Sequence, residues 1–188
     1  SEGCITIDSI SGKNHTVPEK LILKYMKLFN IGSGIRIKSF NNESYTVDII
    51  DEKAKVMPLA DKGMGSIQLT ILLLRIALLM KKYEFSSHNP IILVEEPEQN
   101  LHPKTQSLLA DFFYEISTAF KFQMLVETHS EYLVRKMQVI FASKIKEEEK
   151  NEDELNDIIK VYFFPEESSP YLMTFLKNGR FENTFGSG

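Results

Sequence analysis

Two short apolar segments, each ending abruptly in polar residues, constrain the fold of this chain more than any other feature. The first, residues 91–94, passes into Glu-Glu-Pro-Glu at 95–98, and the second, residues 123–126, passes into Glu-Thr-His-Ser at 127–130. Residues 104–120 between them have apolar positions at helical spacing. A strand at 91–95, a helix at 104–120 and a strand at 122–127 predict, in this order, two parallel strands of a buried sheet, because such strands are continuous apolar runs. We therefore expect an α/β fold.

The polar residues after these strands are predicted to meet at one edge of the sheet. Open parallel sheets bind ligands outside the carboxyl ends of their strands. Glu95 and Glu96 are well placed there to hold Mg²⁺ and to orient a water molecule, and His129 to donate to a terminal phosphate. Each signal alone is weak, since the acidic residues are equally compatible with a solvated turn and a lone histidine after a strand is more often structural.

A turn with two glycines opens the longest apolar helix. Residues 61–66 read Asp-Lys-Gly-Met-Gly-Ser, and the helical pattern continues to about Lys82. The free amides and partial positive charge of a helix N-terminus attract anions. Two glycines before a helix are common, so the turn gains meaning only together with the two strand ends.

In this order, the three pieces resemble the ABC-type ATPases, most closely the RecF, SMC and OLD-like branch. The resemblance covers roughly residues 35–140. It implies part of a P-loop NTPase domain: a mainly parallel sheet that carries the Walker B strand and the switch histidine, a long signature helix and peripheral β-hairpins.

The resemblance implies a role for each residue that matches at the strand ends. Glu95 stands where the family holds Mg²⁺ through a carboxylate, usually Asp. Glu96 stands where a carboxylate polarises the attacking water, and it is the expected general base. His129 matches the switch histidine, which contacts the γ-phosphate.

Two further segments match the family's loops. The run Gln-Asn-Leu-His-Pro at 99–103 matches the D-loop, with His102 where transporters carry Asp. The later part of the signature loop is matched by Gly65, Ser66 and Gln68. Gly63 stands where the usual Ser is expected, and the missing hydroxyl weakens the grip on the γ-phosphate.

The implied activity is hydrolysis of ATP, with Mg²⁺ as cofactor, between two head-to-tail protomers of a homodimer. The signature loop of one protomer closes over the nucleotide that the other holds. We therefore expect a nucleotide-driven dimerisation switch. Nucleic acid or an effector protein would be contacted through the parent protein.

The phosphate-binding loop of such a site is missing from the sequence. That loop requires Gly-x-x-x-x-Gly-Lys-Ser/Thr. The chain's Gly-Lys pair, Gly12-Lys13, has Ile7 at the earlier glycine position and Asn14 in place of the hydroxyl residue, so we interpret it as an ordinary loop. The chain also begins without Met and ends in Gly-Ser-Gly. We expect an excised fragment that hydrolyses ATP negligibly by itself, with the loop upstream in a longer parent.

The pattern divides the chain into three parts. Residues 1–60 are expected to hold a strand, a helix at 18–30 and a β-hairpin at 35–49; residues 61–142 the ATPase core, with a last helix at 131–140; and residues 143–188 an acidic linker and strands near 161–164 and 172–176. A short extended piece is expected at 55–59. The acidic segment 144–157 is interpreted as a solvated linker or helix face. The expected core comprises Met57, Leu72, Leu73, Ile76, Leu79, Ile92, Val94, Leu108, Phe112, Leu125 and Val126.

Composition limits the other function classes. A net charge of −4 and a pI near 5.6 give no basic field for sequence-independent nucleic-acid binding. The single Cys4 excludes an internal disulfide. The most apolar run, residues 71–80, is interrupted by Arg75 and is shorter than the ~20 residues of a membrane helix, so it is expected to be a core helix. The N-terminus lacks the pattern of a signal peptide, and we expect a cytoplasmic protein without a membrane span.

Two alternatives stay open at this stage. The altered signature loop is compatible with a degenerate ATPase that serves as a dimerisation or interaction module. A metal-dependent phosphoesterase would instead use Glu95, Glu96, His102 and His129 as direct ligands. The tail after His129 is too short for the acidic nuclease domain that OLD-like proteins append. DNA repair, phage defence and toxin control are equally compatible with the sequence.

Overall fold

The structure is a computed structural model that describes residues 2–10, 12, 14–41, 44–84, 86, 90–147 and 150–183. The chain forms two compact units, Ser1–His129 and Ser130–Gly188. The division into three functional parts stays a prediction, because these units are defined by their contacts alone.

The first unit begins with an antiparallel sheet. It consists of β1 (Glu2–Asp8), β2 (Gly34–Phe40), β3 (Ser44–Ile50) and β4 (Val56–Pro58), hydrogen-bonded in that order. The predicted hairpin is β2 and β3; Asn42 in its predicted turn lies outside the described residues. Ile7, Ile35 and Ile49 are register partners across the sheet and are buried, so they anchor the sheet to the core.

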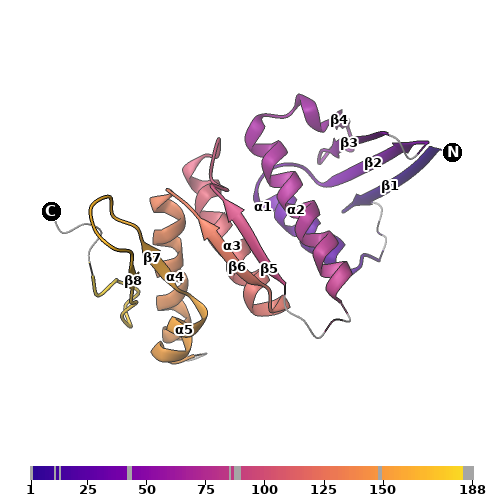
Figure 1. Ribbon diagram of the computed structural model, residues 1–188. Helices are drawn as coiled ribbons and strands as arrows, with labels where there is room; N and C mark the ends of the chain where they lie inside the picture. The colour runs from indigo at the N-terminus through magenta and orange to yellow at the C-terminus, as the bar shows by residue number, and fades with distance from the viewer. Residues whose placement is uncertain are drawn as a thin grey trace. The chain divides into compact units, whose positions relative to one another are not determined.

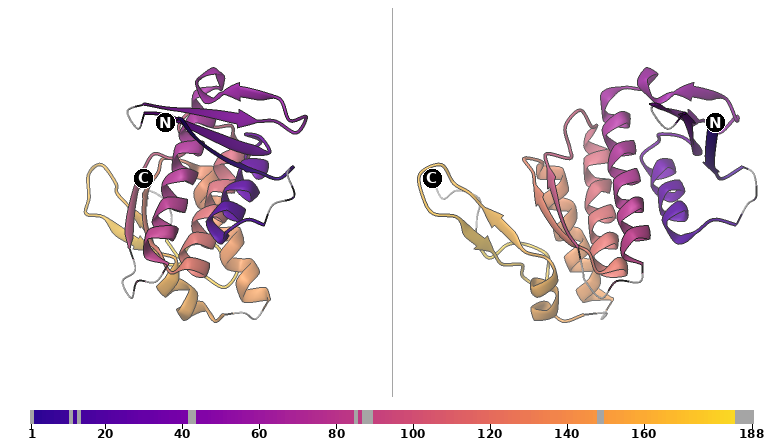
Figure 2. Two further views of the ribbon diagram at one scale, coloured as in Figure 1. Left: turned by 90° about the vertical axis from the view of Figure 1, so that its right-hand side faces the viewer. Right: turned by 45° about the vertical axis from the view of Figure 1, so that its right-hand side comes forward.

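Three helices run side by side next to this sheet (Figure 1, Figure 2). They are α1 (Val17–Leu28), α2 (Met64–Tyr83) and α3 (Pro103–Phe120), with a 3₁₀ turn η1 (Leu59–Asp61) before α2. Proline stands in the first turn of α1 and of α3, where its missing N–H costs no helical bond. At α1 the Thr16 amide donates to Glu19 Oε2 at 2.8 Å, and this bond lowers the pKa of Glu19.

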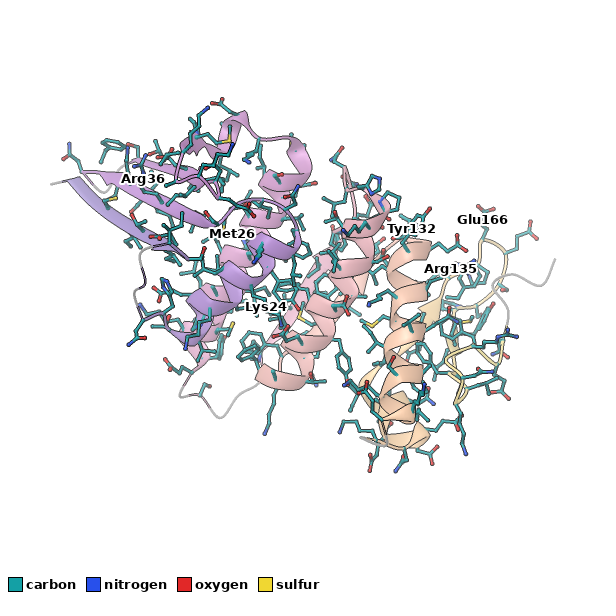
Figure 3. All side chains as sticks on the ribbon, turned by 180° about the vertical axis from the view of Figure 1, so that it is seen from behind. Lys24, Met26, Arg36, Tyr132, Arg135 and Glu166 are labelled. Atoms are coloured by element: carbon teal, nitrogen blue, oxygen red, sulfur yellow. The ribbon has the colours of Figure 1, made fainter. Side chains whose placement is uncertain are left out.

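Aromatic side chains join α1 to α3. The Phe112 ring lies 4.7 Å from that of Tyr25, 6.2 Å from that of Phe29 and 5.6 Å from that of Phe113. The Tyr25 hydroxyl donates to Glu115 Oε2 at 2.5 Å, and Lys24 binds the same oxygen. Burial and the neighbouring carboxylate raise the pKa of Tyr25 well above its usual range. Figure 3 labels Lys24 and the fully buried Met26 on α1.

Replacing Tyr25 with Phe is expected to lower the free energy of unfolding by about 1–3 kcal/mol, because a buried hydrogen bond to a charged acceptor is lost. Urea denaturation measures the change. Tyr45→Phe is the matched control, since Tyr45 is exposed on the sheet. Equal stability of the two variants would show that the bond from Tyr25 to Glu115 does not contribute.

The predicted strand-helix-strand unit is present. β5 (Ile91–Glu95) and β6 (Gln123–Glu127) pair in parallel, from Ile91 opposite Gln123 to Glu95 opposite Glu127, and α3 connects them. One face of the pair is open, because Leu93 is 72% and Leu125 is 60% exposed. An α/β fold with a parallel sheet is therefore confirmed, but this sheet is uncovered on one side.

Some of the predicted core residues in the helices are fully buried, whereas those in the strands are half-buried or exposed. Leu73 and Ile76 of α2 and Phe112 of α3 are buried. The prediction for Leu125 is wrong, because its side chain lies on the open face of the parallel pair. The remaining predicted core residues are half-buried: Met57, Leu72, Leu79, Ile92, Val94, Leu108 and Val126.

α2 is a core helix, as expected. Its 20 residues and mean hydropathy of 1.6 make it, within the described part of the chain, the one helix that could cross a membrane by length and composition. The same composition is found in core helices of soluble proteins. Here Leu69, Leu73, Ile76 and Met80 are buried, and α2 packs against α1.

The second unit contains α4 (Glu131–Lys146), α5 (Glu152–Ile158) and an antiparallel pair, β7 (Val161–Phe163) and β8 (Tyr171–Met173). α4 extends beyond the predicted end at Ile140. The acidic segment is partly helical, since α5 lies within it and buries Leu155. Stacked Phe141 and Phe175 rings, 4.7 Å apart, form the centre of this unit.

Candidate active site

The residues that follow β5 and β6 are held together by the last bonds of the parallel pair. Glu95 and Glu127 are register partners, and the Glu96 amide donates to the Glu127 carbonyl at 2.9 Å. Glu96 has φ +42°. This left-handed conformation is rare for a residue with a side chain and costs on the order of 1–3 kcal/mol. The chain thus turns sharply where the predicted general base stands.

The structure brings Glu96 and His129 together, as the order of the two strands predicted. Glu96 Oε1 lies 3.3 Å from His129 Nε2. The side-chain amide of Gln99 donates to the other carboxylate oxygen, Oε2. The imidazole is 77% exposed, so neighbouring side chains do not enclose it. A carboxylate and a histidine in contact at the carboxyl edge of a parallel sheet form an arrangement suited to proton transfer.

Glu98 differs from the solvated carboxylate that the sequence allowed. It is 8% exposed, and its Oε1 accepts the backbone N–H of His129 at 2.6 Å. The turn after β5 is therefore tied to the segment after β6 by a side chain as well as by the backbone.

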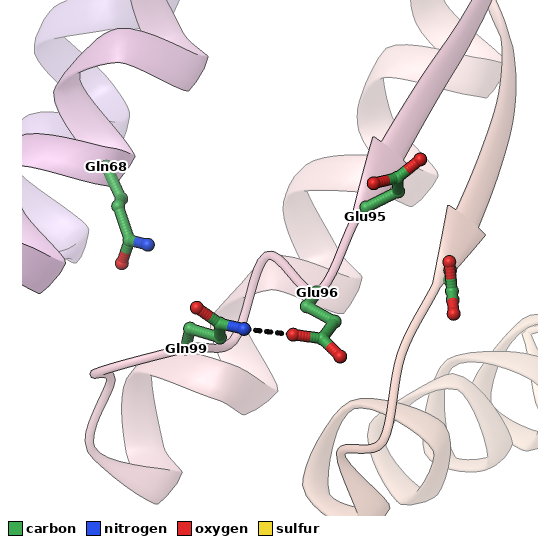
Figure 4. A pocket seen from close by; sticks show the side chains of 5 residues that line it. Gln68, Glu95, Glu96 and Gln99 are labelled. Atoms are coloured by element: carbon green, nitrogen blue, oxygen red, sulfur yellow. Dashed lines mark hydrogen bonds between the residues drawn. The ribbon is translucent and has the colours of Figure 1, made fainter.

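A pocket of about 380 Å³ lies beside Glu96 (Figure 4). Its lining is polar and comes from Gln68 of α2, Glu95 and Glu96, Gln99, and Glu127 of β6. Glu127 was missed by the sequence reasoning, although it follows Val126 as Glu95 follows Val94, so the parallel pairing could have indicated it. Three of the five lining residues are therefore carboxylates.

The predicted signature segment lies against the predicted D-loop. α2 begins at Met64, with Gly63 as its N-cap. A Cβ on Gly65 would lie 2.6 Å from the Asn100 carbonyl oxygen, and Asn100 donates to Gln68 Oε1 at 3.5 Å. Ser66 lies in the first turn of α2, where its amide donates to the Gly63 carbonyl at 2.9 Å.

His102 does not line the pocket. It is the N-cap of α3, where its Nδ1 accepts the Lys104 amide at 3.4 Å, and its side chain is exposed. The assignment of His102 to nucleotide binding stays a prediction.

Comparison with known protein families assigns the chain to one of them. A profile of the AAA ATPase domain matches residues 6–134. The chain belongs to the AAA ATPase domain family. The predicted resemblance to nucleotide-binding ATPases is thereby confirmed for the segment that contains Glu95, Glu96 and His129. No curated protein sequence matches this AAA ATPase domain.

Two solved structures are similar to this chain. One, described as structural biochemistry of ATP-driven dimerization and DNA-stimulated activation of SMC ATPases, has a TM-score of 0.51 and 15% identity, over 85% of this chain and 86% of that chain. Another is the Smc head domain with an extended coiled coil bound to the C-terminal domain of ScpA from Pyrococcus furiosus, with a TM-score of 0.47 and 18% identity, over 62% of this chain and 29% of that chain. The first likeness confirms the fold of an SMC-type ATPase head.

The carboxylates of this AAA ATPase domain fit Mg²⁺ as partial ligands. Mg²⁺ in ATPases is bound through one or two carboxylates together with phosphate oxygens and water. Glu95 lines the pocket beside Glu96, and its role as a Mg²⁺ ligand stays a prediction. No cluster of three His, Cys, Asp or Glu side chains among the described residues could hold a metal by itself. The phosphoesterase alternative counts His102 among its ligands, and His102 is not among the residues that line the pocket.

The close approach at Gly65 gives a direct test of the local packing. Gly65→Ala is expected to destabilise the domain by about 1–3 kcal/mol, because the new methyl group overlaps a backbone oxygen. Gly63→Ala is the matched control, since its Cβ would meet nothing within 4 Å. Thermal unfolding of both variants measures the difference. If Gly65→Ala were as stable as Gly63→Ala, α2 and the 99–103 segment would not be in contact.

Proposed function

We propose that this AAA ATPase domain supplies the hydrolytic side of an ATP site. The contact between Glu96 and His129 at the edge of the parallel strands carries this proposal. It is supported by the family match, which includes both residues. The name half-site is used below for Glu95, Glu96, Gln99 and His129.

In this half-site Glu96 acts as the general base. Its carboxylate accepts a proton from water as the water oxygen attacks the γ-phosphorus, and the bond to the β,γ-bridging oxygen breaks, which releases ADP and phosphate. Gln99 fixes the carboxylate through Oε2. His129 donates a hydrogen bond to a γ-phosphate oxygen. Glu95 would hold Mg²⁺, which would neutralise phosphate charge when bound.

The segment 63–68 acts on the nucleotide of a second protomer. The N-terminal amides of α2 and the side chains of Ser66 and Gln68 are directed at the terminal phosphate of ATP bound to the partner. His102 lies in the D-loop segment at the same dimer interface. An SMC ATPase of similar fold is described as dimerising in an ATP-driven manner, and for the present chain we propose a head-to-tail dimerisation switch.

The phosphate-binding loop comes from outside these residues in our proposal. No Gly-x-x-x-x-Gly-Lys-Ser/Thr motif occurs in the sequence. The open face of the parallel pair, formed by Ile91, Leu93 and Leu125, is the surface that the rest of the ATPase domain covers. The 188 residues alone are therefore inactive in ATP hydrolysis. A cytoplasmic location of the protein stays a prediction. Contact with nucleic acid or an effector would be made by other parts of the protein.

Light scattering of a chain that also carries the loop tests the switch. We expect a monomer without nucleotide or with ADP, and a dimer with ATP when hydrolysis is slowed by withholding Mg²⁺. An unchanged mass with ATP would contradict the switch. Dimerisation without any turnover in the presence of Mg²⁺ would instead support the alternative, a degenerate interaction module.

A further inference from the structure

We propose that Glu98 is a positioning residue that fixes the main chain of His129, so that the imidazole meets Glu96. The catalytic consequence rests on the proposed function, whereas the positioning itself does not. The proposal stands on one juxtaposition: a buried carboxylate in the turn after β5 that accepts the backbone N–H of the residue two places beyond β6.

The backbone hydrogen bonds between β5 and β6 do not extend to the His129 amide. The parallel pairing ends with the bond from the Glu96 amide to the Glu127 carbonyl. Pro97 then redirects the chain, and the turn closes through the bond from the Leu101 amide to the Glu98 carbonyl. Glu98 Oε1 takes the His129 N–H at 2.6 Å, a short bond of the kind formed with a charged acceptor. The Glu98 side chain thus supplies the acceptor that the backbone of β5 would have supplied if the strand had continued.

The burial of the Glu98 carboxylate costs free energy, so substitutions of Glu98 should affect the bond to the His129 amide. The residue is 8% exposed, and its second oxygen, Oε2, has no hydrogen-bond partner among the described residues. Burying a carboxylate with one oxygen unpartnered is unfavourable. Glutamine can accept the same bond without a buried charge. The substitutions Glu98→Gln and Glu98→Ala therefore separate the bond from the charge.

The position of the imidazole depends on its main chain. The His129 side chain is 77% exposed, and its Nε2 contacts Glu96 Oε1 at 3.3 Å. Packing therefore contributes little to its orientation. A shift of the backbone by about 1 Å would separate the two groups, and misplacement on this scale can cost on the order of 100-fold in rate.

Amide hydrogen exchange, followed by NMR without nucleotide, tests the positioning. In the unmodified chain and in Glu98→Gln, the His129 amide should exchange slowly compared with amides of exposed loops. In Glu98→Ala it should exchange at least ~10-fold faster, while the amides of buried Leu109 and Phe112 keep their rates. Glu96→Gln is the control, since it leaves the bond to the His129 amide intact.

Two outcomes would overturn the proposal: an unchanged His129 rate in Glu98→Ala, or an equal rise at Leu109 and Phe112, which would indicate a merely structural role. Should Glu98→Ala not fold, rapid exchange of His129 in the unmodified chain or in Glu98→Gln is decisive against it.

Steady-state kinetics of a chain that carries the phosphate-binding loop separates this proposal from the function itself. We expect Glu98→Ala to lower kcat by about 10- to 100-fold with little change in KM, and Glu98→Gln to recover most of it. Unchanged kcat in Glu98→Ala contradicts the catalytic consequence of the positioning. If the loop-bearing chain without any substitution does not hydrolyse ATP but the exchange pattern is as expected, the positioning stands and the proposed function fails.

Discussion

Replacing Glu96 with glutamine, in a chain that also carries the phosphate-binding loop, is expected to lower ATP turnover by about 100- to 10,000-fold while ATP binding is retained. Glutamine keeps the size and the contact with His129 but cannot accept the proton of the attacking water. Phosphate release measures turnover, and a fluorescent ATP analogue measures binding. The retained binding should also lengthen the lifetime of the ATP-bound dimer.

Glu131→Gln is the matched control for this experiment. Glu131 lies two residues beyond His129 in sequence, but its exposed side chain pairs with Arg135 at 2.5 Å. Its loss should leave turnover within about twofold, since exposed ion pairs contribute little. Unchanged turnover in Glu96→Gln would remove Glu96 as the general base.

Phe112→Ala is expected to have the largest effect on stability, a loss of about 3–5 kcal/mol. The ring is fully buried between α1 and α3 and contacts Tyr25, Phe29 and Phe113. Removal of the ring leaves a cavity at the contact between α1 and α3. α3 begins directly after the turn that follows β5, and this turn contains Glu96 and Gln99 of the half-site. We therefore expect the half-site to lose its order when α3 loses its packing.

Urea denaturation compares Phe112→Ala with Phe164→Ala, whose ring is 74% exposed. The exposed substitution should change the free energy of unfolding by less than about 0.5 kcal/mol. A loss below 1 kcal/mol in Phe112→Ala would show that α1 and α3 are not packed as described here.

The sequence predicted the elements whose signals are local and strong. β5 was placed at its observed residues, and α3 and β6 within one residue of their observed starts, because a continuous apolar strand, a proline and an amphipathic helix follow one another there. The contact between Glu96 and His129 was also predictable, since parallel strands bring their carboxyl ends to one edge. The left-handed turn at Glu96 was not, because several residue types can adopt that conformation.

The missed features depend on packing. An apolar residue such as Leu125 is predicted to be buried in the core. Its exposure depends on which elements cover the sheet, and the sequence of β6 does not contain that information. Glu98 reads as a solvated acid, and its burial follows from the turn that directs it toward His129. Glu127 became a pocket residue through its pairing with Glu95. Each of these is set by a neighbour distant in sequence.

The most direct test of the half-site is a calorimetric titration of the 188 residues with Mg-ATP. Our account predicts no saturable heat at micromolar protein, because the half-site lacks the loop that holds the phosphates, and it predicts that binding appears when the chain carries that loop. Tight, stoichiometric binding of ATP by the 188 residues alone would contradict it.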